Sequence, residues 1–367
     1  MPRVKNQSHL WRSPMAQLFV GEEGLAESSG LDANIFIQSR SSPLSMANLN
    51  VAVLGELGYS ESLGKKGTST DITFYNLKKG DATVTFIEPS KYPERLAPLF
   101  YAVSTARRAI LVIGDITPIF GEIVVMLHSI GLESGFIVLK NFMPRERVIP
   151  LIKGTVVEKY EFVEDNPNDL RARLLGETER LGSEAPSPAQ TQGTVLIDHS
   201  FNVKGVGTVA LGCVSSGSIH VHENLSVLPG GKSAFIRSIQ KHDDDFDWAI
   251  EGDRVGLAIK DVAVEDLERG TVLTSGGSIR SSLTVNADAE LVKYWTNPLK
   301  TSMVLHLGHW MQFLPARVES IEDAGDWRRA SLSLKLEKPL AYLPGDRAVL
   351  AYLEGGKLRV AGAAKLN

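Results

Sequence analysis

The sequence changes character at a short stretch rich in proline and serine, and this change constrains the fold more than any other feature. The stretch is Ser183–Gln190, SEAPSPAQ. Before it, apolar runs of strand length alternate with amphipathic runs of helix length; after it, short alternating strands are separated by glycine turns. The first pattern favours a mostly parallel sheet covered by helices, and the second favours β-barrels. We therefore predict a multidomain chain, with an α/β domain followed by two β-barrel domains.

Length and local composition place the predicted borders. A chain of 367 residues is long enough for two or three domains. We expect a disordered leader or an upstream start codon over 1–45, an α/β domain over 46–182, a linker over 183–192, and barrels over 193–283 and 284–367. The first segment lacks sustained periodicity, but an arm that docks on the body through Leu31–Ile37 remains an alternative.

Charge and cysteine content exclude several classes of protein. The net charge of −4 gives no overall basic field, so any RNA contact has to come from a local patch. A single cysteine, Cys213, rules out a disulfide framework within the chain and fits a reducing compartment, so we expect a cytoplasmic protein. No apolar run approaches the roughly 18–20 residues that span a bilayer, so no membrane partner is expected.

The segment before the linker contains the pattern of a sheet alternating with helices. Strands are predicted at Val51–Leu54, Ala109–Gly114 and Gly135–Leu139, and a hairpin at Thr70–Leu77 and Ala82–Ile87. Helices are predicted at Pro93–Arg108, Gly121–Ile130 and Asn168–Leu181.

The turn after the first strand begins like a phosphate-binding loop but lacks its key residues. Such a loop has the pattern G-x-x-x-x-G-K-[ST]. Counted from Gly55, Ser60 takes the place of the second glycine and Glu61 that of the lysine. A carboxylate there would face the phosphates. A near match follows at Gly64-Lys65-Lys66, but its spacing is one residue too long and Lys66 replaces the hydroxyl residue that binds Mg²⁺.

Four segments after the linker resemble domain 2 of translational GTPases. They are Ile197–Val209, Ile236–Gln240, Glu251–Gly256 and Leu267–Gly270. From Met46 onward, over roughly 320 residues, the chain resembles the EF-Tu family of translation elongation factors. Within that family it most resembles the SelB-like branch, including the paralogues described as EF-Pyl and linked to pyrrolysyl-tRNA.

The resemblance implies GTP binding, yet the residues expected for it are absent. Glu88–Tyr92 stands in place of the family's D-x-P-G-H motif, and Phe142 in place of the aspartate in its guanine-binding N-K-x-D motif. With Glu61, these replacements predict no GTP or Mg²⁺ cofactor and no GTP hydrolysis. The alternative is an authentic GTP-binding elongation factor with an altered loop. Its nucleotide-binding residues would be Gly64, Lys65, Lys66 and Ser69, with Ser69 in the place of the Mg²⁺-binding threonine.

The resemblance also implies a pocket in the first barrel that receives the aminoacyl group of a tRNA. The positions that match are Asp198, His199, Phe201, Leu211, His242 and Arg254. Asp198 would pair with Arg254 or with the α-amino group of the ester. The alternative interpretation places Phe201 and Leu211 in the barrel core and makes Arg254 a residue that only follows the Gly252 turn.

We therefore predict a protein that binds the acceptor end of aminoacyl-tRNA, with the ribosome and pyrrolysyl-tRNA as further partners that the resemblance suggests. A scaffold that binds neither ligand is a third hypothesis. His220 and His222 share one face of a strand, but no cysteine or carboxylate follows at metal-site spacing, so no metal is expected.

Overall fold

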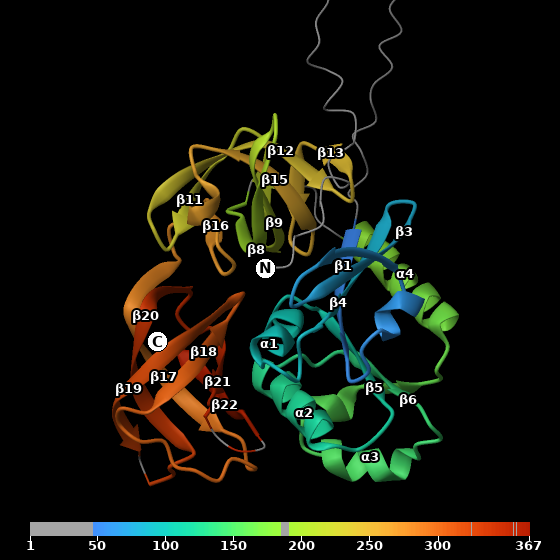
Figure 1. The fold of residues 1–367 in the computed structure, drawn as a ribbon, viewed down its shortest axis with the longest axis vertical. Helices are drawn as coiled ribbons and strands as arrows, with labels where there is room; N and C mark the ends of the chain where they lie inside the picture. The colour runs from blue at the N-terminus through green and yellow to red at the C-terminus, as the bar shows by residue number, and fades with distance from the viewer. Residues whose placement is uncertain (1–46, 185–190, 324, 355, 357) are drawn as a thin grey trace, which may run out of the picture.

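The computed structural model describes residues 47–184, 191–323, 325–354, 356 and 358–367, which form an α/β domain and two β-barrels (Figure 1). The predicted fold class is therefore confirmed. The leader predicted over 1–45 lies outside the described residues, as does most of the predicted linker.

The α/β domain is built on a seven-stranded sheet in the order β2-β3-β4-β1-β5-β6-β7. The strands are β1 Ala47–Leu54, β2 Lys65–Ser69, β3 Thr73–Lys79, β4 Ala82–Glu88, β5 Arg108–Ile113, β6 Gly135–Leu139 and β7 Glu161–Val163. Strands β4, β1, β5, β6 and β7 are parallel, whereas β2 and β3 are antiparallel additions at one edge. The run Val51–Leu54 is fully buried, as expected of a central parallel strand covered on both faces.

The helices are α1 Ala97–Ser104, α2 Pro118–Ile130, α3 Arg145–Ile152 and α4 Pro167–Glu184. The predicted helix Pro93–Arg108 was too long at both ends. Pro98 lies in the first turn of α1, the position where a proline without an N–H is tolerated. Beyond the helix, the Arg107 N–H already donates to the Asn50 carbonyl, so the chain has joined the sheet. The prediction also missed α3, which contains Pro150, and the short strand β7.

The first barrel pairs its strands in the order β11-β16-β8-β9-β15-β12, and β11 also pairs with β12. The strands are β8 Thr194–Val203, β9 Gly207–Ser216, β11 Asn224–Leu228, β12 Lys232–Lys241, β15 Arg254–Lys260 and β16 Val272–Thr274. Three short strands complete it, β10 Ser218–His220, β13 Asp244–Phe246 and β14 Trp248–Ile250. The predicted glycine turns lie between strands, for example at Gly205 (φ 84°) between β8 and β9.

The second barrel is closed in the order β17-β20-β19-β18-β21-β22. Its strands are β17 Arg280–Leu291, β18 Val304–His309, β19 Gln312–Asp323, β20 Arg329–Tyr342, β21 Arg347–Ala351 and β22 Val360–Leu366. The barrel lies against α1 and α2 of the α/β domain (Figure 1), and β21 and β22 contact α2.

All three parts of the molecule contribute to one buried apolar cluster. It contains Ile72, Phe74, Ile87 and Ala102 from the α/β domain, Leu196 and Val272 from the first barrel, and Met311 and Ala341 from the second. The parts are therefore packed on one another through apolar surface as well as through polar contacts. Within the described residues, no helix is both long enough and apolar enough to cross a membrane.

Candidate functional site

A cavity of about 590 Å³ lies between the α/β domain and the first barrel. Its walls come from the β2–β3 edge of the sheet and from β8, β9, β12 and β15. The lining includes two sets of residues predicted for different roles. They are Phe201, Leu211, His242 and Arg254 from the predicted aminoacyl pocket, and Gly64, Lys65 and Lys66 from the alternative nucleotide site. The fold thus brings into one cavity two sets that lie more than a hundred residues apart in the sequence.

Arg254 joins both walls of the cavity. Its guanidinium makes a two-pronged ion pair with Asp198, with N–O distances of 2.5 and 3.1 Å. The guanidinium carbon lies 3.6 Å from the centre of the Phe74 ring, on β3 of the α/β domain. Asp198 is only 5% exposed, so its charge is buried together with that of its partner. Asp198 therefore contributes to the cavity by holding Arg254 and does not line it.

Phe201 and Leu211 lie in the cavity wall and not in the barrel core. Both are half-buried, and neither belongs to the apolar cluster that fills the barrel. His199 does not line the cavity; its ring packs against Phe201, with the two ring centres 5.6 Å apart. Partial burial lowers the pKa of His199 below its ordinary value. The cavity wall therefore contains four of the six predicted residues, and the other two support it.

His242 contributes to this wall and contains a buried nitrogen without a partner. Its Nε2 atom is buried and has no hydrogen-bond partner among the described residues. Burial, reinforced by the charge of Arg254, lowers the pKa of His242 to about 4, so the ring is neutral at pH 7. His242 therefore adds an uncharged ring to the wall, and its buried nitrogen is a polar group without a hydrogen bond.

The rim of the cavity on the side of the α/β domain is basic. Lys65 and Lys66 are exposed on β2, the edge strand of the sheet, and Arg171 reaches the rim from α4. Ser69, the fourth residue of the alternative nucleotide site, does not line the cavity, and its hydroxyl lies 2.9 Å from that of Thr73. The four residues predicted for that site are therefore not gathered around one point.

The turn after β1 is closed by a carboxylate of the protein itself. Glu88, at the end of β4, accepts hydrogen bonds from the backbone N–H groups of Gly58 (2.9 Å) and Ser60 (3.3 Å), and is only 4% exposed. Glu61, which the sequence pattern placed opposite the phosphates, is instead exposed at the rim of the cavity. The carboxylate that faces the loop is thus a different one, and the sequence carried no local signal for it.

The space beside this turn is occupied by a second polar cluster. Lys140 pairs with Glu56 at 2.9 Å, and its ammonium group lies 5.5 Å from the centre of the Tyr59 ring. The hydroxyl of Tyr59 donates to Asp165 at 2.9 Å. The hydrogen bond to Glu56 raises the pKa of Lys140. Phe142, which is predicted to replace a guanine-binding aspartate, is fully exposed and has a positive φ of 58°.

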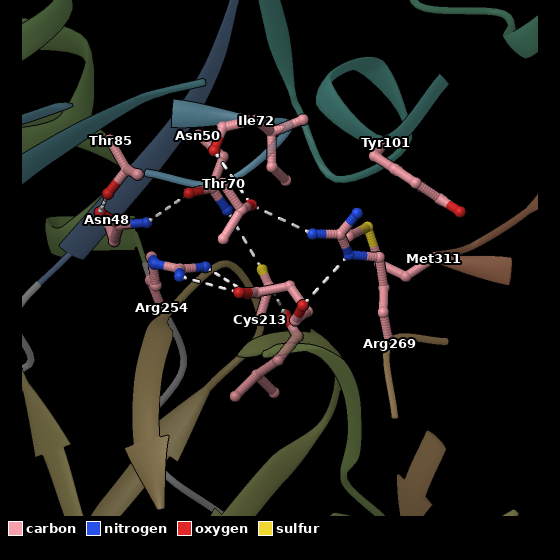
Figure 2. Close-up of polar contacts among 12 residues, drawn as sticks. Asn48, Asn50, Thr70, Ile72, Thr85, Tyr101, Cys213, Arg254, Arg269 and Met311 are labelled. Carbon is pink, nitrogen blue, oxygen red and sulfur yellow. Dashed lines mark hydrogen bonds and ion pairs between the residues drawn. The ribbon is translucent and has the colours of Figure 1, made fainter. Parts of the chain in front are cut away.

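Polar contacts also join the α/β domain to the first barrel outside the cavity lining, and sequence inspection missed them. Figure 2 shows Arg269 of the first barrel reaching Thr70, at 3.2 Å, in the loop between β2 and β3. Arg269 also pairs with Asp71 at 2.7 Å. In the same view, beside Thr70, Asn50 of β1 donates to the buried Sγ atom of Cys213 at 3.1 Å. Each pair joins residues more than 160 positions apart, so neither could be recognised from local spacing.

Comparisons with known proteins agree with this architecture. A family model described as elongation factor Tu domain 2 matches residues 207–274. An uncharacterized protein of Methanocaldococcus jannaschii, MJ0325, is 35% identical over 328 residues, covering 88% of this chain and all of the relative. The selenocysteine-specific elongation factor of the same organism is 34% identical over 133 residues, or 35% of this chain and 28% of that protein.

A solved crystal structure of a translation elongation factor shares this fold. The apo crystal structure of translation elongation factor SelB from Methanococcus maripaludis superposes with a TM-score of 0.72 at 21% identity, covering 88% of this chain and 80% of that one. The α/β domain and two barrels therefore have the fold of this SelB structure, and the first barrel matches elongation factor Tu domain 2. The chain belongs to one family with the uncharacterized relative from M. jannaschii, and it is similar to SelB in fold and, over part of its length, in sequence.

Proposed function

We propose that this protein binds the acceptor end of aminoacyl-tRNA in the cavity between the α/β domain and the first barrel, and that it does so without GTP. The observation that carries the proposal is the buried carboxylate of Glu88 on the N–H groups of Gly58 and Ser60. Those groups lie in the turn where a nucleotide-binding member of the family would need to receive phosphates. An anion already bonded there repels a second one.

The cavity supports the tRNA part of the proposal. Its inner wall combines the apolar surfaces of Phe201 and Leu211 with the neutral ring of His242, and its rim carries the exposed ammonium groups of Lys65 and Lys66. A ligand with a phosphate-bearing end and an uncharged, partly apolar end is complementary to this arrangement. An aminoacylated 3′ terminus has both features.

An authentic GTP-binding elongation factor is the second candidate, and the position of Gly64, Lys65 and Lys66 favours it. These residues line the same cavity, so a nucleotide bound there would occupy the place proposed for the tRNA end. A nucleotide and the tRNA end would therefore occupy the same space, so a competition experiment between GTP and aminoacyl-tRNA distinguishes the two functions.

The test is a pair of titrations with the full chain. We expect aminoacyl-tRNA to bind with the same affinity in the presence and absence of GTP and Mg²⁺. We also expect no saturable binding of a fluorescent GTP analogue at micromolar concentration. Phe201→Ala should weaken binding of aminoacyl-tRNA about tenfold, since about 1–2 kcal/mol of apolar contact is removed. Lys300→Ala, on the second barrel and outside the cavity lining, is the matched control.

Micromolar GTP binding that is abolished by Lys65→Ala would overturn the proposal in favour of the second candidate. Equal binding of aminoacylated and deacylated tRNA would show that the cavity does not recognise the aminoacyl group. We further propose a cytoplasmic protein that meets the ribosome, with pyrrolysyl-tRNA as its cognate tRNA. This last assignment fails if pull-downs recover no tRNA above background.

A further inference from the structure

The eight residues Glu88–Arg95, which we call the brace, are connected to the turn after β1 and to both barrels. The brace begins at the end of β4 and leads into α1. In a switch protein of the GTPase type, a bound phosphate orders segments of this kind, and hydrolysis releases them. In this chain the contacts that order the brace come from the protein.

The first contact is to the turn after β1. The two carboxylate oxygens of Glu88 each accept one backbone N–H, from Gly58 and Ser60. A buried carboxylate with two N–H donors is held in a charge-assisted arrangement of the kind a phosphate oxygen would make. Gly55 and Gly58 both have positive φ angles, 100° and 86°, which aim the turn at that carboxylate.

The second contact reaches the first barrel through Asp71, in the loop between β2 and β3. The N–H of Lys91 donates to the carbonyl of Asp71 at 3.1 Å. The side chain of the same Asp71 pairs with Arg269 of the barrel at 2.7 Å. The charge of Arg269 keeps the pKa of Asp71 below its ordinary value, although burial opposes this shift.

The third contact is to the second barrel. The hydroxyl of Tyr92 donates to the buried Glu122 at 3.1 Å. Glu122 in turn accepts from Arg359 of the second barrel, through Nη2 at 2.6 Å and Nε at 3.1 Å. Arg359 also donates directly to the Pro93 carbonyl at 3.1 Å. A single short segment is therefore tied to the turn and to both barrels.

We propose that Glu88 is a built-in anion that takes the place of a bound phosphate, and that through the brace it keeps the three domains permanently in one arrangement around the cavity. The proposal deepens the proposed function and rests on its claim that no nucleotide occupies the turn. It makes the cavity between domains a constant feature of the protein and not one that appears in a single nucleotide state.

The test replaces the carboxylate and then supplies it again. In full-length Glu88→Ala, we expect the melting temperature to fall by about 5 °C or more. Acetate matches the missing CH₂–COO⁻ in size, so potassium acetate should restore at least half of this loss, whereas potassium chloride at equal ionic strength should not. Glu61→Ala removes an exposed carboxylate from the same turn and is the matched control.

Hydrogen exchange then shows whether the effect spreads along the brace. In Glu88→Ala we expect faster exchange at the N–H groups of Gly58, Ser60, Lys91 and Arg359, with acetate slowing all of them. An effect confined to the turn, or equal rescue by acetate and chloride, overturns the proposal. If Glu88→Ala does not fold, Glu88→Gln keeps the size but sets an NH₂ group against an N–H donor, and the same exchange pattern is expected.

A wild-type experiment separates this proposal from the proposed function. A GTP analogue with Mg²⁺ should leave exchange in the brace unchanged, and a change there would overturn the permanent arrangement. Absence of tRNA binding would overturn the proposed function alone, because the acetate and exchange measurements do not depend on tRNA.

Discussion

Replacing Glu122 by glutamine should destabilise the packing of the second barrel on the α/β domain. Glu122 is 3% exposed and accepts four hydrogen bonds, one from Tyr92 and three from Arg359, including the backbone N–H of Arg359 at 2.8 Å. In Glu122→Gln an amide NH₂ faces the guanidinium, and the charge of Arg359 is left without its partner. Removing one partner of a buried ion pair lowers the free energy of unfolding by about 3–5 kcal/mol. Since the Arg359 side chain is 20% exposed, we expect the lower end, about 3 kcal/mol.

The assay is urea unfolding at pH 7 with the melting temperature as a second measure. A loss of about 3 kcal/mol corresponds to a decrease of about 6–12 °C for a domain of ordinary size. Glu94→Gln, an exposed carboxylate in the brace, is the control and should change stability by less than about 0.5 kcal/mol. Removing both charges, in Glu122→Met with Arg359→Met, should recover part of the loss because no unpaired charge remains. If Glu122→Gln lies within about 1 kcal/mol of wild type, the ion pair does not hold the domains together.

Three further perturbations test other parts of the structure. The pKa of His242 is about 4 in the folded protein and about 6.5 in the unfolded chain, so between these pH values only the unfolded chain binds the proton. The free energy of unfolding should therefore fall by about 2–3 kcal/mol as the pH decreases from 6.5 to 4. His242→Gln should lack this component in pH-dependent urea titrations. Gly55→Ala should give little soluble protein, because a Cβ atom there would lie 2.0 Å from the Val112 carbonyl oxygen and the φ of 100° disfavours a side chain. Normal expression with an unchanged melting temperature would contradict this. Asp253→Asn, which leaves the buried Lys241 without the carboxylate now 2.7 Å from it, should cost about 3–5 kcal/mol in chemical unfolding, and a loss below about 1 kcal/mol would show that this pair is dispensable.

Much of the fold was predictable because its signals are local. The strand Gly135–Leu139 is observed with the predicted bounds, and the predicted hairpin is observed as β3 and β4 with Gly80 in its turn at φ 58°. Strand and helix periodicity depends on neighbouring residues, so it is legible in one sequence. The helix α3 was missed because Pro150 and a polar composition hide its periodicity.

The site was only partly predictable. Resemblance to domain 2 pointed to Phe201, Leu211, His242 and Arg254, and these four line the cavity. Their binding roles stay predictions. The resemblance could not show that Arg254 would stack on Phe74 of another domain, because that contact depends on how the barrel docks.

The sequence by itself indicated most strands, helices and glycine turns, and with them the succession of an α/β domain and two barrels. It also predicts which nucleotide-binding residues are missing, since each expected absence is a substitution at one position. Only the tertiary structure decided that Glu88, and not Glu61, faces the turn after β1, and that Glu122 meets Arg359 across 237 positions. The physical reason is that an unpaired buried charge is destabilised by desolvation, so each buried charge is paired with an opposite charge that lies near it in the packed fold. Spacing along the chain does not indicate which residues will lie near one another in that fold.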